Sequence, residues 1–228
     1  MNREETLLKN VQDIQAALCA SCQKAGRRPE EVTLLAVTKY AQDTDVLFLL
    51  KQGLIKHIGE SRVQQALLRW TQPDFSAFPT VKHLIGHLQH NKAAKAAQFF
   101  DFIDSLDDFS TACLVDKHIA PGRQVRGLVQ VKLTDRDTQS GLSLDQAREL
   151  TKRLRSLERL KVCGYMAIAP QGADTQTLKG LFGTVKKAFD EDFSPKEERY
   201  LSLGMSEDFT VAVEAGSTLP RIGSKLFA

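Results

Sequence analysis

Polar and apolar residues follow two alternating periods along this chain. In the first segment, about residues 2–25, apolar residues recur every three or four positions, which predicts an amphipathic helix that ends near Gly26. From residue 32 onward, short apolar runs alternate with segments of helical periodicity. The run 32–38 contains no charged residue and is rich in β-branched and aliphatic side chains, so it predicts a strand buried on both faces, as in a parallel sheet.

Seven further strands are predicted by the same pattern. The full set of predicted strands is 32–38, 54–59, 81–85, 99–104, 124–133, 160–166, 200–203 and 219–222. Helices are expected at 43–51, 63–70, 144–157, 174–192 and 207–215. Two more are expected, one that begins near residue 90 and one that ends near residue 119. Their expected N-cap residues are Asp43, Asp107 or Asp108, Ser143 and Ser206. A loop rich in polar residues, 134–140, follows the fifth strand.

The alternation of strands and helices predicts an α/β fold. Eight strand–helix units in a chain of 228 residues favour a single-domain (β/α)8 TIM barrel over residues 1–228, with an extra N-terminal helix. An open, doubly wound sheet has the same alternation and remains the alternative.

Composition and charge narrow the class of protein. Hydrophobic residues make up 42% of the chain and charged residues 26%, which is typical of a globular protein. The net charge of +3 is too small to predict a nucleic-acid or membrane-surface partner. No segment approaches the roughly 18 apolar residues of a membrane span, and the start lacks the apolar core of a signal peptide. We therefore expect a cytoplasmic protein.

The sequence lacks most of the common catalytic and metal-binding motifs. Four cysteines are too few for a disulfide framework, and the C-x-x-C pair Cys19 and Cys22 has no second pair to complete a zinc site. There is no glycine-rich Walker loop, no G-x-S-x-G elbow and no cluster with metal-ligand spacing. We therefore expect no metal site.

The residues that could carry chemistry gather where the predicted strands end. In a barrel these positions share one face, the carboxyl-terminal mouth, where ligands bind. They are Lys39, Glu60, Ser61, Gly86, His87, Ser105, Met166, Gly204, Met205, Ser206, Arg221, Gly223 and Ser224. A lysine, an arginine, hydroxyl groups and glycines at one mouth suit a small anionic ligand with an electrophilic carbon.

Two loops are candidates for the anionic part of such a ligand. Ser206, at a predicted helix N-terminus, would offer backbone N–H groups and the helix dipole. Gly223 and Ser224 follow the eighth strand, where phosphates commonly bind in this fold. Each candidate also has a plain structural interpretation: Lys39 as the exit of a strand, Ser206 as an N-cap, Gly223 as a turn residue, Arg221 as the partner of a carboxylate and His87 as a polar loop residue.

Several longer blocks, in order along almost the whole chain from about residue 30, resemble the pyridoxal phosphate homeostasis proteins (the YggS/PROSC family). They are LLAVTK (34–39), IGESRVQ (58–64), HLIGHLQHNK (83–92), SGL (140–142), GYMAI (164–168), LSLGMSED (201–208), AGST (215–218) and RIGSKLF (221–227). The resemblance implies a barrel like the N-terminal domain of alanine racemase, which holds pyridoxal 5′-phosphate as a covalent aldimine on Lys39.

The resemblance also implies the roles of individual residues. Ser206, Gly223 and Ser224 would hold the phosphate, and Arg221 would face the pyridine nitrogen. The predicted cofactor-binding residues are therefore Lys39, Ser61, His87, Met166, Ser202, Met205, Ser206, Arg221, Gly223 and Ser224. Two positions depart from the family pattern: Ser61 replaces an asparagine, which would shorten or remove a hydrogen bond to the cofactor, and Ser224 replaces a threonine and keeps the hydroxyl.

The implied chemistry favours holding the cofactor over catalysis. Lys39 must be deprotonated to attack an aldehyde, and partial burial and a nearby cation would lower its pKa. Arg221 stays protonated, so a cofactor whose ring nitrogen accepts from it is a weak electron sink, which argues against transamination. Racemisation needs an acid or base on each face of the α-carbon. Related racemases bring a tyrosine from an extra domain of the partner subunit, for which this chain has no room after its last strand.

We therefore expect a non-catalytic carrier for intracellular pyridoxal phosphate homeostasis, with no catalytic residue. Its partners would be pyridoxal phosphate and the apoenzymes that depend on it, with no nucleic acid or membrane, and the chain would be a monomer or a weak dimer. Two alternatives stay open. One is an amino-acid racemase of limited activity, in which Tyr40 or Tyr165 assists Lys39. The other is a barrel that binds a different small phosphate noncovalently, with Lys39 as a counter-charge.

Overall fold

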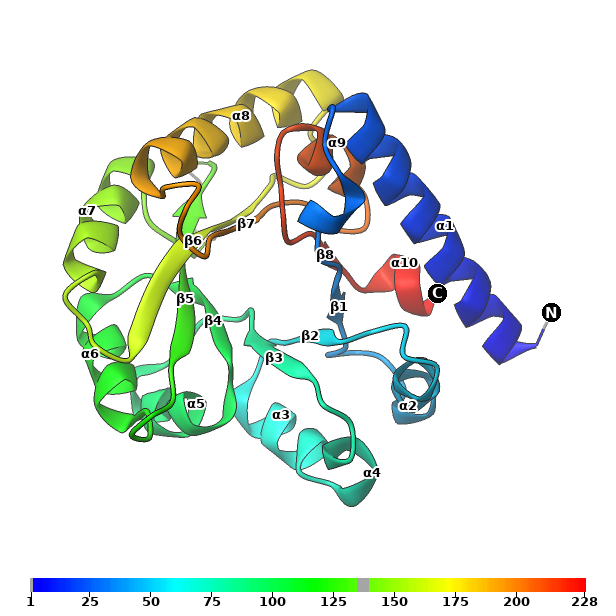
Figure 1. Cartoon of the computed structure of the whole chain (residues 1–228), viewed down its shortest axis with the longest axis horizontal. Helices are drawn as coiled ribbons and strands as arrows, with labels where there is room; N and C mark the ends of the chain where they lie inside the picture. The colour runs from blue at the N-terminus through cyan, green and yellow to red at the C-terminus, as the bar shows by residue number, and fades with distance from the viewer. Residues whose placement is uncertain (1, 135–139) are drawn as a thin grey trace.

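The strands form a nearly closed parallel barrel, with helices around its outside (Figure 1). The computed structural model describes residues 2–134 and 140–228. The strands are β1 (Leu35–Val37), β2 (His57–Glu60), β3 (Val81–Leu84), β4 (Phe102–Leu106), β5 (Val125–Lys132), β6 (Leu160–Ile168), β7 (Tyr200–Ser202) and β8 (Arg221–Ile222). Because β1 pairs with both β2 and β8, the sheet curls round to bring its first and last strands together. The barrel prediction is confirmed, and the open sheet is wrong.

Helices surround the sheet, and all but the first and the last of those described lie between successive strands along the chain (Figure 1). They are α1 (Arg3–Lys24), α2 (Asp43–Lys51), α3 (Val63–Trp70), α4 (Pro73–Ser76), α5 (Ala93–Phe99), α6 (Phe109–His118), α7 (Leu144–Leu154), α8 (Thr175–Asp192), α9 (Phe209–Glu214) and α10 (Ser224–Phe227), with short 3-10 turns at Pro29–Glu31 and His90–Lys92. In the described part of the chain no helix combines the length and apolar character needed to cross a bilayer.

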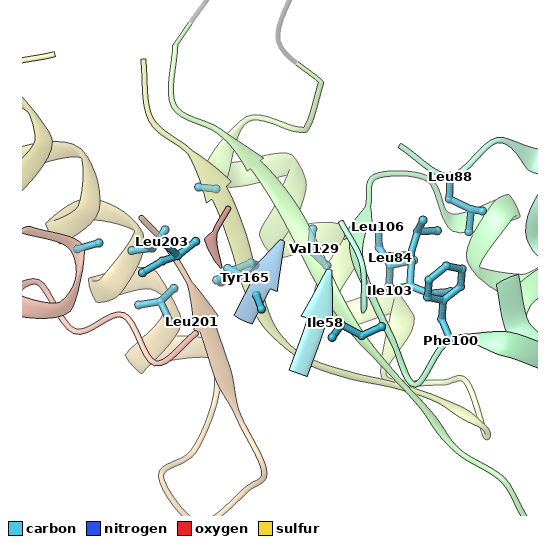
Figure 2. Packing of buried hydrophobic residues seen from close by; sticks show 14 of the residues in the cluster. Ile58, Leu84, Leu88, Phe100, Ile103, Leu106, Val129, Tyr165, Leu201 and Leu203 are labelled. Atoms are coloured by element: carbon cyan, nitrogen blue, oxygen red, sulfur yellow. The ribbon is translucent and has the colours of Figure 1, made fainter. Parts of the chain in front are cut away.

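Buried residues form two separate clusters because successive strand residues face opposite sides of the sheet. The outer layer lies between strands and helices. In Figure 2 its members Leu84, Ile103 and Leu106 gather beside Phe100 and Leu88. The inner cluster contains no helical residue among those described, so it fills the barrel itself; its buried members are Leu35, Phe102, Leu128, Cys163, Met166 and Leu219. The sheet is thus buried on both faces, as the continuous apolar runs predicted.

The barrel closes between β7 and β8 through loop and side-chain hydrogen bonds, with no strand ladder between the two. The Ser202 hydroxyl donates to the Leu219 carbonyl (2.9 Å), and the Arg221 N–H donates to the Gly204 carbonyl (3.0 Å). Ser217, buried at the same place, accepts from the Leu203 N–H (3.2 Å) and bonds to the Leu203 carbonyl (2.7 Å). We call this region the seam.

The N-terminal helix packs across the seam side of the barrel, against α9 and α10 (Figure 1). Arg3 donates to the backbone carbonyls of Phe227 and Ala228, both at 2.8 Å, and pairs with Asp45 at 2.6 Å. Asn10 donates to the Leu226 carbonyl (3.2 Å). The extra helix therefore holds the segment that follows β8.

Several predicted boundaries are wrong at the strand ends. The last strand is Arg221–Ile222 and not 219–222, because Pro220 has no N–H to donate to a ladder. The first strand is Leu35–Val37 and not 32–38; before it, the Thr33 N–H donates to the Thr218 carbonyl of the seam loop.

Other segments differ from prediction in the middle of the chain. Phe99 ends α5 and does not begin the fourth strand, which starts at Phe102. The sixth strand runs on to Ile168, so Met166 lies inside it and not after it. Asp43 is the first residue of α2 and not its cap. Residues 135–139 of the predicted polar loop lie outside the described residues.

Candidate functional site

A buried arginine lies at the centre of the candidate site. Arg221 is on β8, and its side chain shares the inner face with Ser202 of β7, because Leu201, Leu203 and Ile222 on either side belong to the outer layer. Arg221 donates to the Ser202 carbonyl (2.7 Å) and hydroxyl (2.8 Å) and to the Ala167 carbonyl (2.8 Å).

The charge of Arg221 is held by neutral acceptors. Only 4% of the residue is exposed, and none of the described carboxylates lies within ion-pair distance of its guanidinium. Burial lowers the pKa of Arg221 to about 10, while Asp104 and then Asp208 act in the opposite direction. The side chain is therefore still a cation at neutral pH, and it is not the partner of a carboxylate.

The loops after β7 and β8 are joined at the mouth. The Ser206 hydroxyl accepts from the backbone N–H of Lys225 (3.2 Å), in the first turn of the short helix α10. Gly223 directly precedes that helix and packs against the end of β1: a Cβ there would lie 3.2 Å from the Cβ and the carbonyl oxygen of Val37. Ser224, the first residue of α10, is exposed.

Ser206 does not cap the helix that follows it, and that prediction is wrong. The helix starts later, at Phe209, because residues 205–208 form a turn of their own. The Phe209 N–H donates to the Met205 carbonyl (2.9 Å), and the Met205 N–H donates to Asp208 (2.6 Å). The Ser206 side chain is thereby turned towards α10, where it meets the Gly223–Ser224 loop.

Lys39 lies in a tight turn just beyond β1. The Ala41 N–H donates to the Thr38 carbonyl (3.0 Å), so Lys39 and Tyr40 are the two central residues of the turn. Both side chains are exposed, with the Lys39 ammonium 5.1 Å from the centre of the Tyr40 ring. The partial burial expected of Lys39 is wrong, because both central residues of the turn are exposed to solvent.

Arg69 and Glu60 hold this turn; Glu60 was predicted to lie at the mouth, and Arg69 was not predicted to be part of it. Arg69, on α3, donates to the carbonyls of Thr38 (2.7 Å) and Ala41 (2.9 Å). Glu60, buried at the end of β2, accepts from the Thr38 hydroxyl (2.7 Å) and from Arg69 (3.1 Å). A carboxylate directly after an apolar strand is expected to be buried, and a buried carboxylate is usually paired with a cation. The position of Glu60 in the sequence could therefore have predicted a partner such as Arg69.

The loops after β2 and β3 form the next part of the mouth. Ser61 and Gly86 touch so closely that a Cβ on Gly86 would lie 2.2 Å from the Ser61 carbonyl oxygen. The Ser105 hydroxyl donates to the Gly86 carbonyl (2.7 Å). His87 is exposed and lies 3.2 Å from Asp107, whose pKa is raised by burial despite the neighbouring imidazole. Position 86 therefore admits only glycine if this loop contact is kept.

The two methionines predicted for the site occupy different environments. Met166 is fully buried in the inner cluster and is the register partner of Ser202 across β6 and β7. Met205 is 37% exposed on the loop after β7. Met166 is thus a wall of the barrel interior, and Met205 belongs to the rim.

The barrel interior also holds a polar chain below the mouth. His57, at the amino-terminal end of β2, lies 3.0 Å from His83, and His83 lies 3.1 Å from Asp104. Burial, and then the electrostatic effect of the neighbouring His83, lower the pKa of His57 to about 4. Phe102 stacks on the His83 ring at 4.1 Å. This row of polar side chains was not predicted from the sequence.

The three tyrosines of the chain occupy three different places. The Tyr165 hydroxyl donates to Asp192 (2.7 Å) in the outer layer, and burial raises its pKa. Tyr200 begins β7, at the amino-terminal end of the barrel, where burial raises its pKa to about 12. Tyr40, 88% exposed, is the tyrosine beside Lys39.

Strand order places the remaining predictions at one mouth. β7, β8, β1, β2 and β3 follow one another around the barrel, with the seam between β7 and β8. The structure joins Ser202 to Arg221 and Ser206 to the α10 loop, and it places the Lys39 turn on the strand next to β8. A primary amine, a buried cation and an anion-accepting pair of loops on adjacent strands can hold a small anion that also carries an electrophilic carbon.

This chain is similar in sequence to known proteins over most of its length. The sequence profile described as alanine racemase, N-terminal domain, matches residues 13–228. A protein of Escherichia coli K12 named pyridoxal phosphate homeostasis protein is 32% identical over 227 residues, covering 96% of this chain and 94% of its own.

Two solved structures share the whole fold. An unknown protein from Bifidobacterium adolescentis has a TM-score of 0.88 at 25% identity, over 100% of this chain and 97% of its own. PipY of Synechococcus elongatus PCC7942, solved with PLP bound, has a TM-score of 0.79 at 32% identity, over 94% of this chain and 100% of its own.

Proposed function

Because this chain belongs to the alanine racemase N-terminal domain family, we propose that it binds pyridoxal 5′-phosphate at its barrel mouth and serves in the homeostasis of that cofactor. The observation that carries the proposal is Arg221, a buried cation whose partners are all neutral. Burying a cation without a counter-charge costs free energy, and a ligand acceptor at the guanidinium would offset part of that cost.

The donors of the mouth fit the two ends of this cofactor. Arg221 can donate to a pyridine nitrogen but cannot leave a proton there. The Ser206 hydroxyl and the loop of Gly223 and Ser224 lie after the seventh and eighth strands, beside a short extra helix, which is where phosphates commonly bind in this fold. Gly223 leaves the backbone close to Val37, so the loop stays near β1 and Lys39.

We propose that Lys39 holds the cofactor covalently, as a Schiff base. Pyridoxal phosphate, when bound, supplies an aldehyde that condenses with a primary amine, and the exposed Lys39 turn carries such an amine on the strand beside β8. Met166 and Ser202 would line the inner wall, and Ser61, His87 and Met205 would line the rim. Ser61 is shorter than the asparagine of related proteins, so its contact would be the weakest of these.

We propose that the protein is a carrier and not a racemase. A two-base racemisation needs a second acid or base opposite Lys39. Tyr165 packs in the outer layer and Tyr200 begins β7 at the amino-terminal end of the barrel, and both have raised pKa values. That leaves Tyr40 as the tyrosine beside Lys39. A weak racemase activity through Tyr40 is the second candidate function. The expectations of a cytoplasmic location, a monomer or weak dimer, apoenzyme recipients and one domain over 1–228 belong to the same proposal.

The covalent link is tested by absorption and trapping. Pyridoxal phosphate added to the purified protein should give a visible band that sodium borohydride removes, and peptide mapping should then find the reduced label on Lys39. Lys39→Ala should lose the band, whereas Lys51→Ala, a matched exposed lysine at the end of α2, should keep it. A colourless wild-type protein, or a label on another lysine, would overturn the proposal.

Carrier and racemase are separated by proton exchange. The loaded protein is incubated with single-enantiomer amino acids in deuterated water, and deuterium at the α-carbon is followed by NMR. We expect no catalytic exchange. Sustained exchange with turnover that is lost in Tyr40→Phe would establish the racemase instead.

A further inference from the structure

The turn that presents Lys39 is fixed at both ends by one side chain. Thr38 and Ala41 are its first and last residues, and Arg69 donates to the carbonyl of each, at 2.7 and 2.9 Å. The two contacts use different nitrogens of the same guanidinium, as the planar fork of arginine allows. Lys39 and Tyr40 between them have exposed side chains, so the packing of Lys39 itself contributes little to its position.

The guanidinium of Arg69 is itself held in place by two carboxylates. Asp43, the first residue of α2, pairs with its Nε at 2.8 Å, and Glu60 pairs with its Nη1 at 3.1 Å. The Arg69 side chain is 18% exposed and the Glu60 side chain 5%. Arg69 therefore links three successive elements of the mouth, the β1 turn, α2 and the end of β2.

Glu60 is committed to this cluster. One of its oxygens accepts from the Thr38 hydroxyl (2.7 Å), from Arg69 (3.1 Å) and from the indole N–H of Trp70 (3.1 Å). A buried carboxylate that lost Arg69 would be left without its cation, which is a strongly destabilising change. The Arg69–Glu60 pair is therefore best tested with substitutions that keep the approximate size and shape of the replaced side chain.

We propose that Arg69, held by Glu60, is the positioning residue for Lys39: it sets where the Lys39 amine lies relative to Arg221 and the α10 loop. This inference rests on the proposed function of Lys39. In that reaction the lysine nitrogen attacks the aldehyde carbon, a C=N bond forms and one water leaves, with no oxidation or reduction. Without Arg69 the turn is free to reorient, and a misplacement of about 1 Å can slow a reaction about a hundredfold.

The test compares Arg69→Gln with Arg123→Gln. Arg123 is a matched control because it also donates to two backbone carbonyls, of Ala97 and Phe100, and pairs with a carboxylate, Asp101, but before β5 at the other end of the barrel. Two quantities are measured for each folded protein. One is the rate of Schiff-base formation with pyridoxal phosphate, by stopped-flow absorption. The other is the dissociation constant of pyridoxine 5′-phosphate, which lacks the aldehyde.

We expect Arg69→Gln to slow Schiff-base formation about 10–100-fold while pyridoxine 5′-phosphate binds within about twofold of wild type. Arg123→Gln should change neither quantity. A general loss of structure would weaken both, so the split identifies positioning. Arg69→Lys keeps the charge but not the planar fork, and it should give an intermediate rate. If Arg69→Gln does not fold, the rate of Arg69→Lys tests the proposal in its place. A wild-type rate in either folded variant would overturn the inference.

A third measurement separates this inference from the function it rests on. Hydrogen exchange of the Ala41 amide, which donates to Thr38, is followed in cofactor-free protein and should accelerate in Arg69→Gln only. If wild type forms no Schiff base at Lys39 yet this exchange accelerates, the proposed function fails and the clamp on the turn stands. If the exchange does not change, the clamp is wrong whatever Lys39 does.

Discussion

The two sides of the barrel are built in different ways. Between β5 and β6 the strands pair over eight residues, from Val125 with Leu160 to Lys132 with Ile168. At the seam, β8 pairs with β1 over two residues and has no ladder with β7. There the backbone groups are satisfied by Ser202, Ser217 and the loop before β8.

This contrast indicates which side of the barrel can bind a ligand. A long ladder uses every backbone N–H and C=O for pairing, and it leaves only side chains to project into the barrel. Short strands end early, so their loops turn sooner, and side chains that close the seam can also face a ligand. Arg221 and Ser202 do both: they bond to each other across the seam and lie on its inner face.

A core substitution on the β5–β6 side should destabilise the protein most. Leu160, fully buried at the amino-terminal end of β6, contributes to the outer layer. Leu160→Ala should lower the free energy of unfolding by about 2–5 kcal/mol, measured by urea denaturation, because it leaves a cavity. Cofactor binding per folded molecule should not change. Leu68→Ala, at a residue 73% exposed, is the control and should stay within about 0.5 kcal/mol. Reduced binding in Leu160→Ala would mean that the two sides are coupled.

On the seam side, Ser217→Ala should lower the free energy of unfolding by less than Leu160→Ala does. The substitution removes the hydroxyl that satisfies the N–H and C=O of Leu203, both of which are buried. Leaving such groups unpaired costs about 1–3 kcal/mol, and hydrogen exchange at the Leu203 amide should accelerate. Ser156→Ala, which removes an exposed hydroxyl, is the control. Unchanged stability and exchange in Ser217→Ala would show that Ser217 does not close the barrel.

Arg221→Gln should affect binding more than folding. The glutamine removes a buried cation together with its hydrogen bonds, so the two changes in stability oppose each other. A hydrogen bond to a charged group is worth about 1.5–3 kcal/mol, so the affinity for pyridoxal phosphate should fall about tenfold or more, measured by equilibrium titration. Arg123→Gln serves again as the control. An unchanged affinity would remove Arg221 from the site.

His57, in the barrel interior, should make the stability of the protein weakly dependent on pH. The folded-state pKa of His57 is about 4 and its ordinary value is 6.5, so between these two pH values the unfolded chain binds more protons than the folded one. Stability should therefore fall as the pH drops from 7 through 6.5 towards 4. His57 is partly exposed, and after solvent screening we expect a loss of about 1 kcal/mol, measured by urea denaturation at each pH. His57→Gln should flatten this slope, and an equal slope in both proteins would exclude His57 as its cause.

Local signals in the sequence are confirmed where the interaction that they describe is also local. Ser143 caps α7 by accepting from the Gln146 N–H three residues later, and Asp108 caps α6 in the same way through Thr111. The strand cores follow from continuous apolar runs, because a barrel buries both faces of its sheet. Lys39 and Arg221 could be selected as candidates for a mouth because the fold puts strand ends together.

Predictions from the sequence fail where the deciding partner is distant in the chain. Ser206 has the sequence context of an N-cap, but its partner is the N–H of Lys225, on another loop. Arg69 and Glu60 belong to one helix and one strand, and their common target is the turn at Thr38, 31 and 22 residues away. The sequence around Glu60 indicates that this carboxylate needs a cation, but nothing near Glu60 or Arg69 along the chain specifies the turn at Thr38 as their common target.

The pairing of β1 with β8 also determines when, during synthesis, the barrel mouth can be completed. Leu35 and Arg221 are register partners, so the first strand made must wait for the eighth before the ring can close. On the ribosome, a growing chain displays Lys39 as an ordinary amine, with no Arg221 and no α10 loop beside it. If Lys39 holds the cofactor as proposed, only chains that have completed β8 would bind it at this mouth, and a chain stopped before β8 would not.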